Sequence, residues 1–301
     1  MSAPLEMGTG SPATAILGVG GYRPARVVTN AEVIELIDSS DEWIRERSGI
    51  VSRHRAAVHM STTVSSAAAV SVAHRLGATG AAAFDISAAC AGFCHALALA
   101  SDMVRAGSAG HVLVVGCEKL SDLVDPTDRS TAFLFGDGAG AAVVGPAAQP
   151  GIGPVVWGAD GGQADAITQT RPWDELRTDR AGAFPTLTMS GQQVFRWAVY
   201  QMAPVCEEAM ARAGVSAADL DAFIPHQANL RIVEALAKRL GLPADLPVAR
   251  DIVTTGNTSA ASIPLAMERM LDTGQAPSGG TALLVGFGAG LSYAAQVVTL
   301  P

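Results

Sequence analysis

The 301-residue sequence has little charge, few aromatic residues and only four cysteines. Charged residues form 16% of the chain and apolar residues 49%, a balance that is typical of a folded protein and excludes a disordered one. Four cysteines without a C-x-x-C pair do not form a disulfide framework and do not support a zinc or redox site. A net charge of −8 argues against a nucleic-acid-binding surface.

Signals for secretion and membrane insertion are missing or interrupted. The first residues contain no basic segment followed by a long apolar run, so we expect no signal peptide. Residues 281–300 are uncharged and long enough to span a membrane, but Gly286, Gly288 and Gly290 interrupt them. We therefore expect two buried strands joined by a glycine turn, in a soluble cytoplasmic protein without membrane or nucleic-acid partners.

Short apolar runs alternate with helical patterns along the chain. We expect strands at 13–22, 81–87, 111–116, 139–145, 221–226 and 281–286. One helix is expected after an Asn30 cap, and a second is expected to begin within 39–43. Further helices are expected over 91–106, 191–213, 229–240 and 259–273. This alternation predicts an α/β fold with buried, largely parallel strands.

The second half of the sequence repeats the order of elements in the first. Residues 98–107 and 111–116 resemble 265–274 and 281–286, and 135–142 resembles 287–294. Chance similarity between segments rich in Ala, Gly and Val is the alternative, but the matching order favours a duplicated α/β unit. We therefore divide the chain into an N-terminal half, 1–148, and a C-terminal half, 149–301.

The duplication draws attention to three polar residues. Cys90 and Asn257 fall at corresponding positions, each just before a helix, and His226 ends an apolar strand. A helix N-terminus stabilises a thiolate, so Cys90 is a candidate nucleophile. Each residue also has an ordinary interpretation, as a buried cysteine, a strand-end histidine or an asparagine cap. The remaining cysteines, Cys94, Cys117 and Cys206, are expected to be buried and inert.

Six segments resemble β-ketoacyl-ACP synthase III, and actinobacterial members most closely. They occur in the family's order at 41–50, 85–93, 135–143, 225–232, 256–262 and 286–294, and the resemblance extends from about residue 14 to 301. It implies a thiolase-like duplicated fold with α-β-α-β-α layers and a homodimer. It also implies an acyltransferase that starts fatty-acid or polyketide chains without a metal or other cofactor.

The resemblance further implies a decarboxylative Claisen condensation. Cys90 would be acylated by a short acyl-CoA primer and then attacked by the carbanion that malonyl-ACP forms on losing CO2. His226 and Asn257 would donate hydrogen bonds to the malonyl thioester oxygen, in the manner of an oxyanion hole. The backbone N–H groups of Cys90 and Ala289 would hold the oxyanion of acyl transfer.

Substrate contacts carry over from the same resemblance. The family's contacts to CoA and its pantetheine arm fall on Trp43, Arg47, Arg129 and Asn229. Because acyl carrier protein (ACP) is acidic, a basic docking patch is implied, and it falls on Arg196, Arg231, Lys238 and Arg239. The ordinary alternatives are a partly exposed core residue for Trp43 and a solvated helix face for the basic patch.

The sequence departs from the family between 52–57 and 66–77. Several tens of residues are missing near 56–66, including a helix and a strand, and a shorter deficit lies near 174–188. Because losing a central strand leaves backbone groups unpaired, we favour a sequence that does not represent the intact enzyme over a true deletion. Two other functions stay open: a non-catalytic homologue that binds ACP, and an acyltransferase that moves acyl groups from CoA without decarboxylation.

Overall fold

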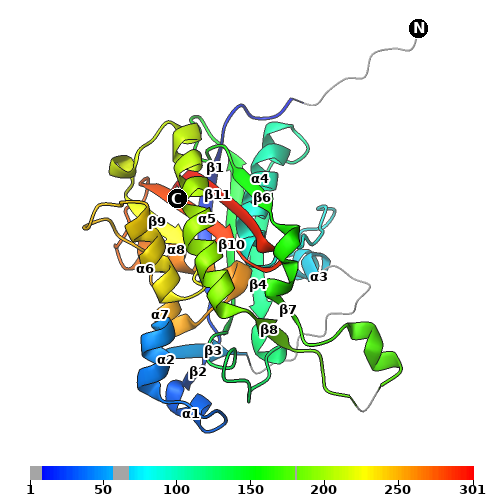
Figure 1. Ribbon diagram of the computed structural model, residues 1–301. Coiled ribbons are helices and arrows are strands. Elements are labelled where there is room, and N and C mark those ends of the chain that lie inside the picture. The colour runs from blue at the N-terminus through cyan, green and yellow to red at the C-terminus, as the bar shows by residue number, and fades with distance from the viewer. Residues whose placement is uncertain (1–8, 57–67, 180–181) are drawn as a thin grey trace.

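The computed structural model describes residues 9–56, 68–179 and 182–301 (Figure 1). Its helices are α1 (Asn30–Ile34), α2 (Asp41–Ser48), α3 (Ala68–Arg75), α4 (Gly92–Arg105), α5 (Gly191–Ala213), α6 (Leu230–Arg239), α7 (Ile252–Thr255) and α8 (Ser262–Asp272). Its strands are β1 (Thr14–Tyr22), β2 (Arg26–Thr29), β3 (Ser52–Arg55), β4 (Val112–Lys119), β5 (Asp137–Pro146), β6 (Val156–Ala159), β7 (Ile167–Gln169), β8 (Leu187–Met189), β9 (Ala222–Pro225), β10 (Thr281–Phe287) and β11 (Ser292–Thr299). Short 3-10 turns occur at η1 (Ala89–Ala91), η2 (Leu120–Asp122), η3 (Gly161–Ala166), η4 (Trp173–Arg177), η5 (Ala217–Asp219), η6 (Ser259–Ala261) and η7 (Ala289–Leu291).

Two larger sheets organise the fold, with strand orders β1-β5-β4 and β6-β11-β10-β9. Their only parallel strand pair among the described residues is β10 with β9, so the expectation of largely parallel strands was wrong. The reason lies in β5 and β11, which pair antiparallel with both of their neighbours. In the second half, a short glycine turn returns β11 directly against β10, as in a hairpin.

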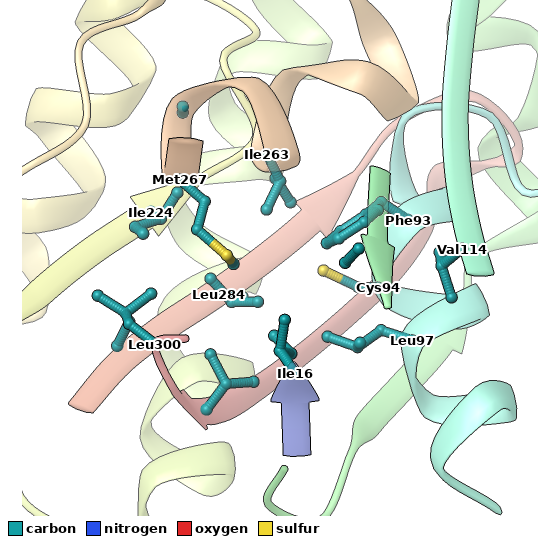
Figure 2. Packing of buried hydrophobic residues seen from close by; sticks show 14 of the residues in the cluster. Ile16, Phe93, Cys94, Leu97, Val114, Ile224, Ile263, Met267, Leu284 and Leu300 are labelled. Carbon is teal, nitrogen blue, oxygen red and sulfur yellow. The ribbon is translucent and has the colours of Figure 1, made fainter. Parts of the chain in front are cut away.

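A helical layer separates the two sheets. Phe93 and Leu97 of α4 and Ile263 and Met267 of α8 point into one buried cluster (Figure 2). The cluster also takes side chains from strands of both sheets, including Leu284 of β10. A second cluster lies between α5, α6 and the other face of the second sheet. Each sheet therefore buries the face that is turned toward the helical layer.

The outer face of the first sheet is much less covered than that of the second. Because strand side chains alternate between faces, Val114 of β4 enters the core while Leu113 and Val115 point away from it. These two side chains remain 45% and 42% exposed. The neighbouring Cys117 is also exposed, which corrects the expectation that it is buried. In the second half, α5 covers the corresponding face.

Residues 81–88 form neither helix nor strand, contrary to the strand expected at 81–87. In the second half, β9 pairs with β10 and then with Val248, so three chain segments share hydrogen bonds. Within the described part of the first half, no strand pairs with the outer edge of β4. Residues 81–87 pair with no strand in the described ranges, and an apolar run without a ladder of backbone hydrogen bonds is not a strand. The expected deletion near 56–66 falls almost wholly on 57–67, outside the described residues.

Other local expectations were confirmed or slightly displaced. Helix α5 occupies the predicted 191–213 and ends at Gly214 in the left-handed conformation, φ 72°. Helix α1 is capped by Thr29 and not by Asn30, whose buried amide donates to Asp41 and to the Ile50 carbonyl. Residues 281–300 form β10, a turn and β11 as predicted, and no helix in the described ranges could span a membrane.

Candidate active site

Cys90 lies in the turn η1, immediately before α4. Two glycines let the end of β10 approach this turn. A Cβ atom at Gly286 would lie 3.0 Å from the Cα of Ala91, and one at Gly288 would lie 2.6 Å from the Cβ of Cys90. Any larger residue at these positions would push β10 away from the cysteine.

Three non-glycine residues with positive φ surround Cys90, and they are the only ones within the described ranges. They are Ala89 (φ 44°), Ser259 (φ 47°) and Leu291 (φ 40°), one in each of η1, η6 and η7. Both η6 and η7 contact η1. Strained backbone of this kind persists where the surrounding structure holds it, and it concentrates at functional sites. The strain therefore identifies this junction of turns as a candidate active site.

Polar groups of all three turns favour the thiolate form of Cys90. They are its own backbone N–H, the backbone N–H of Ala289 and the hydroxyl of Ser259, and each lowers the pKa of the thiol. Burial raises the pKa of the thiol to about 11, and these neighbouring donors act in the opposite direction.

His226 follows β9 and is held beside β10. Its backbone N–H donates to the carbonyl of Val285 at 2.8 Å, and its ring packs edge-to-face on Phe287 at 5.4 Å between centroids. Burial lowers the pKa of the imidazole to about 3, so the ring is neutral. Its Nδ1 lies 2.7 Å from the hydroxyl of Ser262, which also accepts the backbone N–H of Gln227. We assign the hydroxyl proton to Nδ1, which leaves the proton on Nε2 available for donation.

Asn257 is not the counterpart of Cys90 that the sequence comparison predicted. Gly116 of β4 lies against the Ala260 carbonyl as Gly286 of β10 lies against that of Cys90, so the counterpart is Ala260.

Asn257 is nevertheless fixed at both its backbone and its side chain. Its backbone pairs with the segment around Phe135 in a short β-bridge. The Asn257 N–H donates to the Leu134 carbonyl at 2.9 Å, and the Asn257 carbonyl accepts the Gly136 N–H at 3.0 Å. Its Oδ1 accepts the backbone N–H of Ser259 at 2.9 Å. The amide NH2 is therefore the end of the side chain that is turned away from this turn, ready to donate.

These contacts bring the three predicted residues to one place, the C-terminal end of β10. Cys90 lies against Gly288, and His226 contacts Phe287. Asn257 binds Ser259, whose hydroxyl lowers the pKa of Cys90. Ala289 lies at the same point, as the first residue of the turn η7. No group of three metal-ligating side chains occurs in the part of the chain that the structure describes.

The residues predicted to contact CoA also gather. The Arg129 guanidinium lies over the Trp43 ring, 4.5 Å from its centroid. The Arg47 guanidinium lies 5.7 Å from the same centroid. Asn229 caps α6 through its Oδ1, and its Nδ2 donates to the Arg47 carbonyl at 3.0 Å. The cluster therefore places two guanidinium groups against a half-buried aromatic ring. Both ends of the Asn229 amide are already bonded.

The four basic residues predicted to dock ACP lie on two packed helices and are all exposed. Arg196 is on α5; Arg231, Lys238 and Arg239 are on α6. The Arg231 guanidinium lies 5.7 Å from the ring centroid of Phe195, and that of Arg239 lies 4.6 Å from the ring centroid of Tyr200. Both rings belong to α5.

Sequence reasoning missed three residues of the site. Ser259 and Ser262 are small residues in a segment that is rich in them, so nothing in the sequence separates their roles. Glu118 had a detectable signal, because it is a charged residue at the end of the apolar strand β4. Its Oε1 accepts the backbone N–H of Ala260 at 3.3 Å, and burial raises the pKa of its carboxyl.

Comparison with known proteins gives the family. Residues 84–161 match the family described as 3-oxoacyl-[acyl-carrier-protein] synthase III, and residues 210–300 match its C-terminal part. A β-ketoacyl-[acyl-carrier-protein] synthase III of Streptomyces glaucescens is 55% identical over 325 residues, covering 97% of this chain and 98% of the relative. The chain belongs to the β-ketoacyl-ACP synthase III family.

Other members of the β-ketoacyl-ACP synthase III family agree in sequence and fold. A Streptomyces coelicolor member is 55% identical and covers 97% of this chain and 98% of its own. The priming β-ketosynthase of the R1128 polyketide pathway superposes with a TM-score of 0.96 at 45% identity, covering 99% of both chains. The synthase III of Pseudomonas aeruginosa superposes with a TM-score of 0.88 at 37% identity, covering 96% of this chain and 98% of its own. These matches confirm the predicted family and its thiolase-like α/β fold.

Proposed function

We propose that this protein condenses a short acyl-CoA primer with malonyl-ACP to give a 3-oxoacyl-ACP, and so initiates fatty-acid or polyketide chains. The observation that carries the proposal is the meeting of a thiol, a neutral imidazole and a side-chain amide at the end of β10. A nucleophile beside two neutral hydrogen-bond donors suits a reaction that first transfers an acyl group and then stabilises an enolate.

In the first half-reaction, the Cys90 sulfur attacks the thioester carbon of the primer and CoA departs as its thiol. The carbonyl oxygen becomes an oxyanion that needs two donors. The backbone N–H groups of Cys90 and Ala289 favour negative charge on the sulfur, and the attacked carbon forms its bond there. They are therefore suited to hold that oxyanion.

In the second half-reaction, malonyl-ACP loses CO2 and negative charge develops on its thioester oxygen. Nε2 of His226 and Nδ2 of Asn257 would donate to that oxygen. Because the imidazole is neutral, it contributes a hydrogen bond and not a full proton, and its role does not change with pH in the neutral range. The resulting carbanion attacks the acyl group on Cys90, the Cys90 thiolate leaves, and the product remains on ACP.

Substrate recognition fits the same reaction. We assign Trp43, Arg47 and Arg129 to the adenine and phosphates of CoA, since an aromatic face between guanidinium groups suits a nucleotide. Asn229 would contact the pantetheine arm after releasing one of its present partners. The exposed basic residues of α5 and α6 would receive acidic ACP, and they are Arg196, Arg231, Lys238 and Arg239.

We also propose a cytoplasmic homodimer whose subunits each contain the halves 1–148 and 149–301. The sheets support this division, because β1, β4 and β5 belong to the first half and β6, β9, β10 and β11 to the second. The alignment with the S. glaucescens relative spans 325 positions although it includes only 97% of these 301 residues, which supports a sequence shorter than that of the relative.

The test uses the full chain with acetyl-CoA, malonyl-ACP and intact-mass detection. Wild-type protein should gain an acetyl group on Cys90, and Cys90→Ala should gain none. Asn257→Ala should be acetylated normally but lose about 100- to 1000-fold in condensation, the typical effect of removing one oxyanion-hole donor. Binding of ACP without acetylation would instead indicate the non-catalytic homologue. Transfer to ACP without CO2 release, unaffected by Asn257→Ala, would indicate the simple acyltransferase.

A further inference from the structure

Gln227 directly follows His226 and is fully buried, and the reaction described above gives it no role. Its side-chain amide binds two segments of the chain. Nε2 donates to the carbonyl of Pro225, the last residue of β9, at 2.8 Å. Oε1 accepts the backbone N–H of Ile252, the first residue of α7, at 3.1 Å. The amide therefore ties the turn that carries His226 to the start of α7.

The short helix α7 leads directly to Asn257. The N–H of Ile252 binds Gln227, and the carbonyl of Ile252 accepts the N–H of Gly256 at 3.1 Å. Gly256 has φ 74° and immediately precedes Asn257. A Cβ atom on Gly256 would lie only 2.8 Å from the Cβ of Arg53, so this turn is closely packed. The side chain of Gln227 thus reaches the backbone of Asn257 through one turn of helix.

Ser262, the first residue of α8, joins the same two parts of the site a second time. Its hydroxyl lies 2.7 Å from Nδ1 of His226 and accepts the backbone N–H of Gln227 at 3.3 Å. Ile252 precedes Asn257 and Ser262 follows it, at equal separation in the sequence. The segment that carries Asn257 is therefore bound to the turn of His226 and Gln227 on both sides of Asn257.

We propose that Gln227 is a positioning residue for the decarboxylation of malonyl-ACP, because it holds the His226 and Asn257 donors at a fixed separation. The inference rests on the proposed function, in which these two donors share one thioester oxygen. Two hydrogen bonds to one oxygen require both donors to lie about 3 Å from it at the same time. Misplacing such a group by about 1 Å can cost about 100-fold in rate.

A neutral amide suits this position. Burial lowers the pKa of His226 to about 3, and the ring donates as a neutral imidazole. A carboxylate in place of Gln227 would favour the protonated ring, whereas an amide forms the same links without adding charge. None of the hydrogen bonds of Gln227 reaches Cys90, which lies on η1 against Gly288. Acylation of Cys90 should therefore not depend on Gln227.

The test measures two half-reactions of Gln227→Met, which keeps the length of the side chain but forms neither of its hydrogen bonds. The first is CO2 release from malonyl-ACP alone, in which the enolate takes a proton from water to give acetyl-ACP. This release should slow by about 100-fold relative to wild type. The second is single-turnover acetylation of Cys90 by acetyl-CoA, which should keep the wild-type rate.

Two further variants and a control accompany this one. Ser262→Ala is a smaller change, and it should slow CO2 release by about 10- to 100-fold, the range found where such partners orient metal-bound histidines. Gln227→Met combined with Asn257→Ala should slow release by less than the product of the two single effects, since Gln227 acts through Asn257. Gln296→Met removes another fully buried glutamine amide, on β11, and should keep the wild-type ratio of the two rates.

The inference is overturned if Gln227→Met releases CO2 at the wild-type rate. It is also overturned if CO2 release and acetylation fall together, because Gln227 then supports the fold as a whole. Strictly multiplicative effects in the double variant would show that Gln227 acts independently of Asn257. If Gln227→Met does not fold, the same two rates in Ser262→Ala decide. The proposed function fails on a different result, namely wild-type protein that neither releases CO2 nor is acetylated.

Discussion

The two sheets of this protein provide a matched pair of leucines for measuring what covers each outer face. Leu283 of β10 is fully buried in the cluster beneath α5. Leu113 of β4 occupies the corresponding place in the duplicated unit, three residues before Gly116 as Leu283 precedes Gly286, but it remains 45% exposed. We predict that Leu283→Ala destabilises the protein far more than Leu113→Ala.

The magnitude follows from burial. Truncating leucine to alanine removes three carbons, worth about 0.8 kcal/mol each when fully buried. At Leu283 a closed cavity adds to this, which gives about 3–4 kcal/mol. At Leu113 about half of the transfer energy is absent and no cavity forms, so we expect about 1 kcal/mol or less. The two variants should therefore differ by about 2–3 kcal/mol.

Urea unfolding followed by far-UV circular dichroism gives both free energies, provided that the slope with denaturant stays at the wild-type value. Equal large losses in the two variants would refute the reasoning, because Leu113 would then be covered in solution. If a second subunit provides that cover, the loss at Leu113 would also depend on protein concentration.

Three further predictions concern single residues. His226 stays neutral in the fold, with its pKa at about 3, but protonates near 6.5 when unfolded, so stability should fall as pH drops below 6.5. In urea unfolding across this range, His226→Gln should reduce the slope by up to about 1.4 kcal/mol per pH unit; an unchanged slope would contradict this. Gly288→Ala places a Cβ 2.9 Å from Cys90 Sγ, and mass spectrometry should find no acetylation of the folded variant. Arg23→Met leaves the buried Asp251 with fewer partners and should cost about 3 kcal/mol in thermal or urea unfolding; a loss near zero would argue against this.

Much of the fold was predictable because its signals are local. Helix α5 carries its apolar residues on one face and ends at Gly214, so its limits follow from periodicity and a left-handed cap. The strands β10 and β11 follow from an apolar run broken by glycines. The pairing partners were not predictable in this way, since residues 81–87 have a strand-like pattern but pair with no strand that the structure describes.

The chemistry of the site was likewise predictable only in part. The order of short motifs was enough to identify the family and to select Cys90, His226 and Asn257, because the sequence itself contains the residue types that the reaction needs. Only the tertiary structure shows that burial raises the pKa of the Cys90 thiol and that Nδ1 of His226 faces the Ser262 hydroxyl. It alone brought Glu118 and Ser259 to the nucleophile. Protonation depends on burial and on partners far away in the chain, and a sequence pattern records neither.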